Sequence, residues 1–464
     1  MARGVAGKGR KKFFLKTKYG GYHDRLAPRE GCEPGSWVPK EDVELTHVGP
    51  GTPCGEYLRR FWQPIALSSD VQALPKAQRL LGEDLVVYRD KSGTIGCLEL
   101  HCSHRGTSLE FGVVQERGIR CCYHGWLFDA DGTILDTPTE AEDSNLKNKL
   151  LHPAYPTHEH KGMIFVYMGP PEEKPAFPVF DTDEVPGYET VPGIPHVMPC
   201  NWLQLKENTA DPLHIPVLHQ KISGHHFSGY RFDDSKMPEF DWVETPLGMV
   251  SGLVGRSKDV VWVRWSEWIM PNIHQFHITE SAGDCVIDKF CPPRATRWHV
   301  PVDDTHTIVF DYQRLLPKEK PHQEAVLKSF GQRGDRPYHE QQQKPGDYEA
   351  QVSQRPIAVH ALEHLGASDR GVIMFRRLLR EQIRLVAKGK APRNVMKKSN
   401  GPIPTYLRNT GIVTPPKADP QADRKLWREL GRKVAEQAIT DSKSEWKKKI
   451  TLEPYKGTRT EYSG

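Results

Sequence analysis

The chain has 464 residues, of which 37% are hydrophobic and 27% are charged, and its formal net charge is +5. No stretch approaches the ~20 consecutive apolar residues that span a bilayer, so the composition excludes an integral membrane protein. Nine cysteines are too few and too unevenly placed for a disulfide scaffold. Because the basic N-terminus also lacks the apolar segment of a secretion signal, we expect a cytoplasmic protein. The small charge excess gives no reason to expect a nucleic-acid partner.

The N-terminal segment is more basic than the rest of the chain. Residues 1–30 hold nine Lys or Arg and two acidic residues, together with several glycines. We expect residues 1–45 to form a basic arm that is flexible or wraps around a neighbouring subunit.

The pattern changes between residues 46 and 169, where short apolar runs alternate with Gly, Pro and Asp. Runs such as 85–88 and 162–167 are bounded by turn residues, and this pattern predicts a small all-β domain. The stretch 170–197 that follows is rich in Pro and acidic residues, which predicts a linker or crossover.

A second domain is predicted for residues 170–390. Strand candidates lie at 259–265 and 305–312, and the apolar residues of 369–388 recur at the spacings of three and four that indicate an amphipathic helix. The predicted fold class is therefore α+β, with a helix packed on an antiparallel sheet. Residues 391–464 are rich in Pro, Lys and Arg, and we expect a polar C-terminal extension with one exposed helix.

Cysteine and histidine form two short motifs, Cys102-x-His104 and, after sixteen intervening residues, Cys121-x2-His124. Each motif offers one thiolate and one imidazole, so the pair can hold one metal centre from two sides. A tetrahedral zinc ion would need all four donors on a single ion. A Rieske [2Fe–2S] cluster places two thiolates on one iron and two imidazoles on the other. We favour the cluster, because each motif is predicted in a loop and is followed by glycine, whereas zinc fingers place the second pair on a helix.

Cys122 lies beside Cys121 and could be mistaken for the second thiolate ligand. Two intervening residues let the loop turn so that the cysteine and His124 converge on one site. We therefore assign Cys121 as the ligand and Cys122 as a small loop residue.

A second cluster contains Asp211, His214 and His219. The two histidines would point about 140° apart around an ideal α-helix, so a continuous helix could not bring both to one ion. Pro212 and Pro216 remove this obstacle, because they force the helix to distort or break. With a carboxylate from elsewhere, the two imidazoles form a 2-His-1-carboxylate triad, which leaves positions on Fe(II) open for O2 and substrate.

The third iron ligand is expected from a distant segment. Asp369 is the first choice, because it lies at the N-terminus of the amphipathic helix, and that helix can pack against the histidine motif. Its alternative role is that of a plain helix cap. Glu363 and Asp347 are the next candidates.

Together these motifs resemble those of the Rieske non-haem iron aromatic ring-hydroxylating oxygenases, and in particular the catalytic (alpha) subunits of the phthalate 4,5-dioxygenase-like branch. The resemblance covers residues 46–390 and departs from the family at Cys122, where proline is usual. The segments that carry it are 48–53, 59–64, both Cys/His loops, the run Glu207-Asn208-x2-Asp211-Pro212-x-His214-x4-His219, and 363–369.

The resemblance implies a Rieske β domain joined to a helix-grip catalytic domain with a curved antiparallel sheet. It implies a homotrimer or hexamer, in which the cluster of one subunit lies next to the mononuclear iron of the next. Asp211 matches the catalytic carboxylate that bridges the two centres, where it would accept hydrogen bonds from His214 and from a Rieske histidine of the next subunit. Electrons would come from NAD(P)H through a separate reductase or ferredoxin.

The implied function is the oxidation of an aromatic, carboxylated compound with O2, by hydroxylation or O-demethylation, with ring cis-dihydroxylation as the alternative. We favour monooxygenation because the extended chain indicates a bulky substrate. An anchor for the substrate carboxylate is expected among Gln220, Ser223, His225, His226 and Arg264.

Two other classes of protein share some of these features. A non-catalytic Rieske electron carrier would hold two irons per chain rather than three, and the intact second cluster argues against it. A zinc-binding regulatory protein would lack the visible absorption and the reduced-state EPR signal of a Rieske centre.

Overall fold

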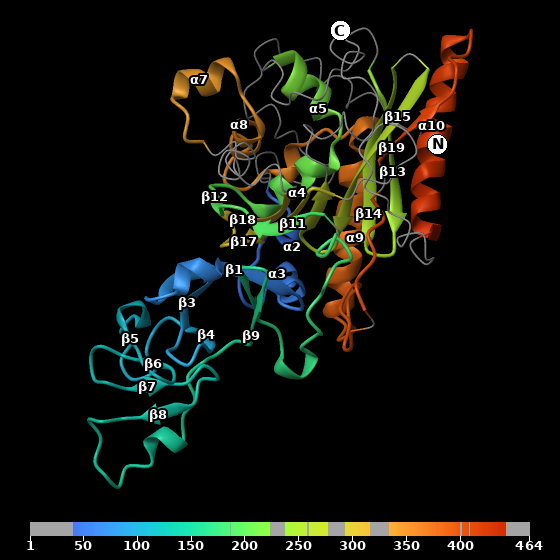
Figure 1. The fold of residues 1–464 in the computed structure, drawn as a ribbon. Helices are drawn as coiled ribbons and strands as arrows, with labels where there is room; N and C mark the ends of the chain where they lie inside the picture. The colour runs from blue at the N-terminus through green and yellow to red at the C-terminus, as the bar shows by residue number, and fades with distance from the viewer. Residues whose placement is uncertain are drawn as a thin grey trace, which may run out of the picture.

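The computed structural model describes residues 40–441, apart from 186, 223–236, 258, 277–292, 316–333, 400 and 408. Figure 1 shows a smaller lobe of short strands attached to a larger body that is built around one long sheet. The predicted basic arm, residues 1–45, lies outside the described residues except for its last six positions.

Three small antiparallel sheets make up the smaller lobe, with strand orders β1–β10–β9, β2–β3–β4 and β5–β6–β7–β8. The run Met163–Tyr167 is buried at every position, which explains why it is apolar throughout rather than alternating. The strands of this lobe are β1 (Trp62–Leu67), β2 (Lys76–Leu80), β3 (Glu83–Arg89), β4 (Ile95–Glu99), β5 (Val113–Val114), β6 (Ile119–Arg120), β7 (Leu127–Phe128), β8 (Ile134–Asp136), β9 (Thr157–His160) and β10 (Met163–Tyr167).

A nine-stranded antiparallel sheet forms the centre of the larger body. Its main path is β11–β18–β17–β16–β15–β14–β13, while β12 pairs with β18 and β19 pairs with β15. These strands are β11 (Glu189–Pro192), β12 (His196–Met198), β13 (Glu239–Thr245), β14 (Gly248–Ser257), β15 (Val260–Ile269), β16 (Ile273–Phe276), β17 (Ala295–Pro301), β18 (Thr307–Leu315) and β19 (Thr410–Val413). The stretch 170–197, predicted as a linker, thus contributes two edge strands.

The long sheet is covered by helices on both faces (Figure 1). Neighbouring residues of β13 point to opposite sides, as strand geometry requires. Trp242 joins the core that Phe375 of helix α9 (Arg370–Val386) enters, whereas Val243 packs with Trp427 of helix α10 (Pro420–Asp441). The C-terminal helix is therefore not the exposed helix that we expected, because one side of it is buried against the sheet.

The amphipathic helix predicted at 369–388 is present as α9, and it packs against helix α4 (Trp202–Ala210). Two short N-terminal helices also rest on α9. The remaining helices are α2 (Val43–Thr46), α3 (Pro53–Leu58), α5 (His214–Pro216), the π-helix η6 (Val217–Ile222), α7 (Tyr338–Gln343) and α8 (Asp347–Val352), with 3-10 turns η2 (Ser68–Val71), η3 (Leu109–Phe111), η4 (Leu146–Asn148), η5 (Pro171–Glu173), η9 (His360–Leu362) and η10 (Ala367–Asp369).

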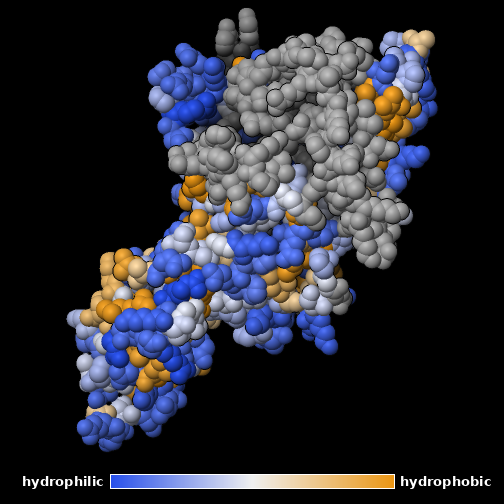
Figure 2. All heavy atoms as spheres, viewed as in Figure 1, coloured by the Kyte–Doolittle hydropathy of each residue, from blue (hydrophilic) through white to orange (hydrophobic). Residues whose placement is uncertain are grey.

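Figure 2 shows hydrophilic residues over much of the visible surface, with apolar patches on the smaller lobe. Exposed apolar residues of that lobe include Phe111, Tyr123 and Leu151. Within the described part of the chain, no helix is both long and apolar enough to cross a membrane.

Candidate active site

The two Cys/His loops of the smaller lobe share one backbone geometry. The N–H of Gly106 donates to the carbonyl of Cys102 at 2.8 Å, and the N–H of Gly125 donates to that of Cys121 at 3.2 Å. Both glycines have a φ of +76°, in the left-handed region that favours glycine. The glycine after each predicted ligand histidine therefore closes a tight turn, and the two turns present equivalent donor sets.

Like donors lie side by side at the tips of these loops. The imidazole rings of His104 and His124 are 4.6 Å apart, and His104 stacks on the buried Trp126 at 4.8 Å. The thiols of Cys102 and Cys121 are buried and lie within reach of each other. Burial raises the pKa of the Cys102 thiol to about 11, so a positively charged metal centre is needed to hold it as a thiolate at neutral pH.

The spread of these donors fits a two-iron cluster rather than one zinc ion. No three of the four donor atoms, all in described loops, lie within 4.8 Å of one another. The donors of a tetrahedral zinc ion must lie about 3.5–4 Å apart. In a Rieske cluster, the iron bound by thiolates is separate from the iron bound by imidazoles. The sulfur and nitrogen donors can therefore lie farther apart than around a single ion. Cys122 is exposed, as its predicted role as a loop residue requires.

The second constellation begins where helix α4 ends. The helix stops at Ala210, and Asp211 is extended with φ −101° and ψ 93°. The chain continues through the short helix α5 into the π-helix η6, so the interruption predicted from the two prolines is present. It brings the rings of His214 and His219 to 5.2 Å from each other.

A carboxylate from helix α8 completes this group. Oδ1 of Asp347 lies 3.5 Å from Nε2 of His214 and 3.2 Å from Nε2 of His219. The amide of Asn208 donates a hydrogen bond to the same oxygen at 3.2 Å. These two histidines and Asp347 offer three ligand atoms within 4.8 Å of one another. The group has the composition of a 2-His-1-carboxylate triad.

The choice of Asp369 as the third ligand is wrong in this structure. Its Oδ2 instead accepts the backbone N–H of Gly366 at 2.6 Å, so the carboxylate closes its own turn at the start of α9. Asp369 occupies the N-cap position of α9, but its side chain makes no capping hydrogen bond to that helix and instead closes the 3-10 turn η10 before it. Asp347 was a lower-ranked candidate, and its only local signal is its place in the first turn of a short helix after Pro345 and Gly346.

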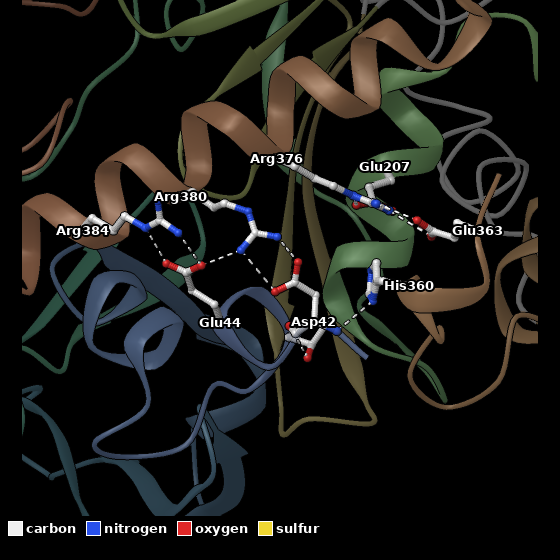
Figure 3. Close-up of polar contacts among 9 residues, drawn as sticks. Asp42, Glu44, Glu207, His360, Glu363, Arg376, Arg380 and Arg384 are labelled. Carbon is white, nitrogen blue, oxygen red and sulfur yellow. Dashed lines mark hydrogen bonds and ion pairs between the residues drawn. The ribbon is translucent and has the colours of Figure 1, made fainter. Parts of the chain in front are cut away.

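Glu363, the other alternative ligand, is occupied by an arginine of α9. Figure 3 shows Arg376 between two carboxylates, those of Glu207 from α4 and Glu363. The guanidinium donates to Glu207 at 2.5 and 2.7 Å and to Glu363 at 2.6 and 3.0 Å. Farther along α9, Arg380 and Arg384 bind Glu44 of the N-terminal helix α2 (Figure 3). The pair of Arg376 with Glu207 ties α9 to α4, the helix that leads into the histidine motif, and the pairs with Glu44 tie α9 to α2.

The electrostatics differ between the two aspartates near the histidines. Burial disfavours the ionised form of Asp347, but the hydrogen bond from His219 and the charges of both histidines outweigh it and hold its pKa well below the ordinary range. Burial raises the pKa of Asp211, against the opposing effects of His214 and the N–H of Leu213. Asp347 is therefore ready to bind a cation as a carboxylate, whereas Asp211 can hold or release a proton more easily.

We expected the carboxylate of Asp211 to accept a hydrogen bond from His214, but the structure shows a different contact. The ring Nδ1 of His214 meets the backbone carbonyl of Asp211, while the Asp211 carboxylate accepts the N–H of Leu213 at 2.8 Å. The carbonyl contact places the proton on Nδ1 and turns Nε2 toward Asp347.

A cavity of about 210 Å³ opens onto these residues. Its lining includes Asp211, His214, His219 and Asp347 from the helical side, and residues of β15, β16 and β17 from the sheet. Arg264, one of the expected substrate anchors, is also part of the lining. Of the other expected anchors, Ser223, His225, His226 and the side chain of Gln220 lie outside the described residues.

Comparison with known proteins assigns the family. Residues 61–156 match the model of the Rieske [2Fe-2S] domain. The chain is 40% identical over 443 residues to the tert-butanol monooxygenase / tert-amyl alcohol desaturase oxygenase subunit of Aquincola tertiaricarbonis, covering 90% of this chain and 91% of the relative. The chain belongs to the Rieske oxygenases, as an oxygenase subunit.

Other relatives of this oxygenase subunit include members of the phthalate 4,5-dioxygenase-like branch that the motifs indicated. It is 30% identical to the 5,5'-dehydrodivanillate O-demethylase oxygenase subunit of a Sphingobium species, over 80% of this chain and 87% of the relative. It is 29% identical to the phthalate 4,5-dioxygenase oxygenase subunit of Pseudomonas putida, over 74% and 85% of the two chains. The oxygenase subunit is therefore an enzyme component with a Rieske [2Fe–2S] cluster and a mononuclear iron site, and the resemblance inferred from the motifs is confirmed.

Solved structures share the fold of this oxygenase subunit. NdmA of Pseudomonas putida CBB5, as a mutant with theobromine, aligns with a TM-score of 0.57 at 19% identity, over 76% of this chain and all of the other. Dicamba monooxygenase bound to dicamba aligns with a TM-score of 0.54 at 19% identity, over 71% and 99% of the two chains. The predicted α+β class with a Rieske β domain and an antiparallel catalytic sheet is confirmed.

Proposed function

We propose that this oxygenase subunit uses O2 and electrons from a separate NAD(P)H-dependent reductase or ferredoxin to hydroxylate or O-demethylate a small aromatic compound. The observation that carries the proposal is that His214, His219 and Asp347 present three ligand atoms to one point and line a cavity of about 210 Å³. A facial triad leaves the remaining positions of the metal free on the cavity side. The same arrangement is not needed by a protein that only carries electrons.

The mononuclear iron is proposed to bind His214, His219 and Asp347, and the Rieske cluster to bind Cys102, His104, Cys121 and His124. Iron bound by the triad would supply the activation of O2. The chain itself orients the ligands: the carbonyl of Asp211 fixes the tautomer of His214, and Asn208 holds the Asp347 carboxylate. His219 is buried, and its Nε2 lies 3.2 Å from Oδ1 of Asp347.

Asp211 is proposed to link the two metal centres of neighbouring subunits in a homotrimer or a hexamer. Asp211 is partly exposed, lies three residues before His214 and lines the cavity, and its raised pKa suits a group that shares a proton with an imidazole. A Rieske histidine of the next subunit would be the partner. Both Rieske imidazoles of this chain are half-buried, so each has surface to offer to a neighbour.

The electron donor is proposed to dock on the smaller lobe near the cluster. Tyr123, next to His124, is 60% exposed, and Phe111 is 66% exposed, so both offer apolar area to a partner on this lobe. One structural neighbour, the oxygenase of carbazole 1,9a-dioxygenase, is recorded in a reduced complex with ferredoxin, and it shares the fold at a TM-score of 0.51.

Relatives at 40% and 30% identity are named as a monooxygenase and an O-demethylase, and one at 39% identity as a dioxygenase, so hydroxylation or O-demethylation is proposed first and ring cis-dihydroxylation second. The test is turnover of the iron-loaded protein with a matched reductase against a panel of hydroxylated, methoxylated and carboxylated aromatic compounds. We expect NAD(P)H-dependent uptake of O2 coupled to product, with formaldehyde released from methoxylated substrates. Formation of cis-diols alone would support the dioxygenase instead.

A further inference from the structure

One wall of the cavity is formed by polar side chains of the long sheet. These residues come later in the chain than the two histidines proposed as iron ligands. His274 of β16 lies opposite Arg297 of β17 in the register of the sheet, and His299 follows two residues later. Cross-strand partners and residues two apart share one face of a sheet. All three side chains therefore belong to the face that lines the cavity.

The two histidines are buried, and several polar atoms of this wall lack protein partners. His274 is 7% exposed and His299 is 3% exposed. Among the described residues, neither ring nitrogen of His274, nor Nδ1 of His299, nor Nε of Arg297 has a hydrogen-bond partner. Buried polar atoms are normally paired, and those left unpaired destabilise the fold until something binds them. A ligand in the cavity is the natural partner for such a group.

The packing around this wall keeps the rings in place. The ring of His274 stacks on Phe276 at 4.8 Å, and the Arg297 guanidinium lies over the same phenyl ring at 5.1 Å. Nη2 of Arg297 also donates to Asp311 at 3.1 Å. The ion pair with Asp311 offsets the charge of Arg297, and among the described residues its buried Nε–H has no acceptor.

Both imidazoles are neutral in this environment. Burial, followed by the charges of Lys206 and Arg297, lowers the pKa of His274 and of His299 well below the ordinary range. A neutral imidazole has one N–H donor and one acceptor nitrogen. The wall therefore offers both donors and an acceptor, with no net charge of its own.

We propose that His274 and His299, together with Nε–H of Arg297, bind a hydroxyl group of the substrate and so determine which substrates the enzyme accepts. This inference rests on the proposed function, because it takes the cavity to be the substrate site. A hydroxyl group donates one hydrogen bond and accepts others, which matches the wall. A carboxylate only accepts hydrogen bonds, and it would add a buried negative charge near Asp311, whose ion pair already engages Arg297. Arg264 also lines the cavity but is already engaged in another interaction.

The test is equilibrium binding of three probes that differ in one substituent: 4-methylphenol, 4-methylbenzoate and 1,4-dimethylbenzene. Binding to the iron-loaded oxidised protein is measured by isothermal titration calorimetry. We expect 4-methylphenol to bind about tenfold more tightly than 1,4-dimethylbenzene, since one well-formed buried hydrogen bond has about that effect, and 4-methylbenzoate to bind no better than 1,4-dimethylbenzene.

Variants identify the residues responsible. His274→Phe and His299→Leu should each reduce the preference for the phenol to less than about threefold, whereas His274→Gln, which can donate and accept, should keep part of it. His306→Leu is the control, because His306 lies in the exposed turn before β18 and does not line the cavity. If His274→Phe fails to fold with its Rieske absorption intact, His299→Leu and His274→Gln decide the question.

The outcomes separate this inference from the proposed function. A phenol preference that survives in both His274→Phe and His299→Leu overturns the inference, as does tighter binding of 4-methylbenzoate than of 4-methylphenol. Failure of every panel compound to turn over, with the phenol preference present and lost in the variants, would overturn the proposed reaction and leave the hydroxyl site standing.

Discussion

Oδ1 of Asp347 lies 3.2 Å from Nε2 of His219, although Asp347 begins helix α8 and His219 lies in the π-helix that follows α4. Asn208, two residues before the end of α4, donates to the same oxygen at 3.2 Å and so ties the two segments together. The position of the carboxylate is thus set by the packing of α8 on α4 and not by the sequence around it.

Replacing Asp211 by asparagine should abolish electron transfer between the metal centres without emptying them. Asp211→Asn keeps the shape and the hydrogen bond to Leu213, but it removes the proton-accepting carboxylate. We expect a loss of at least about 100-fold in turnover, with iron content and Rieske absorption unchanged. Single-turnover oxidation of the reduced cluster measures this step. A wild-type rate in the fully loaded variant would refute the bridging role.

Replacement of the adjacent residues Cys121 and Cys122 should have opposite effects on the Rieske signals. Cys102→Ser and Cys121→Ser remove a buried thiolate ligand, so the visible absorption and the reduced-state EPR signal of the Rieske centre should disappear. Cys122→Ser is the control, because Cys122 is exposed and its replacement should leave both signals in place. Retention of the signals in Cys121→Ser, with their loss in Cys122→Ser, would reverse the assignment.

Arg376 should be more important for stability than its neighbour Arg377. Arg376→Leu leaves Glu207 and Glu363 facing each other without their shared cation, and we expect the free energy of unfolding to fall by about 3 kcal/mol. Arg377 is half exposed in its pairs with Glu244 and Glu381, so Arg377→Leu should cost less than about 1 kcal/mol.

The double variant Glu207→Gln/Arg376→Leu should recover part of that loss, because it removes one of the buried acids. Thermal unfolding of the four proteins, including wild type, provides the comparison. Equal effects of the two arginine replacements would show that the Arg376 bridge is not a principal tie between α4 and α9.

The buried Glu267 should make stability depend on pH. Burial raises its pKa to about 8, against the opposing effect of the N–H groups of Tyr406 and Leu407, which it binds at 2.9 and 3.2 Å. The folded pKa is above the unfolded value of 4.5, so the stabilising contribution of Glu267 is complete below the unfolded pKa and is lost as pH rises through the folded pKa.

Glu267→Gln keeps an acceptor for the same N–H groups but does not titrate. We therefore expect it to match wild type near pH 5 and to be more stable by about 3 kcal/mol near pH 8. Unfolding midpoints measured across this range provide the check. A difference between the two proteins that stays constant with pH would show that Glu267 is charged in the folded protein.

Local patterns in the sequence were sufficient for several parts of the site. The glycines after each predicted Rieske histidine, Gly106 and Gly125, do close equivalent turns, and the proline-interrupted helix does bring His214 and His219 together. These features depend on neighbours in the chain. The apolar spacing that predicted α9 is likewise a local property of the helix.

Long-range packing decided the parts that were mispredicted. Asp369 was a plausible ligand at a helix N-terminus, but the packing of α8 on α4 brings Asp347 to His219 instead. The C-terminal helix was expected to be exposed because of its charged composition. Trp427, Val434 and Ala438 nevertheless recur at spacings of seven and four, and these residues form its buried side. The spacing of these residues can be read from the sequence, but the sequence does not show which face of the sheet they cover.

The most direct test of the iron site is the iron content per chain of two purified aspartate variants. In Asp347→Ala the mononuclear iron should be lost, leaving two irons per chain, unchanged Rieske absorption and no turnover. In Asp369→Ala all three irons should remain. Three irons in Asp347→Ala, or two in Asp369→Ala, would contradict the assignment of His214, His219 and Asp347 as the catalytic triad.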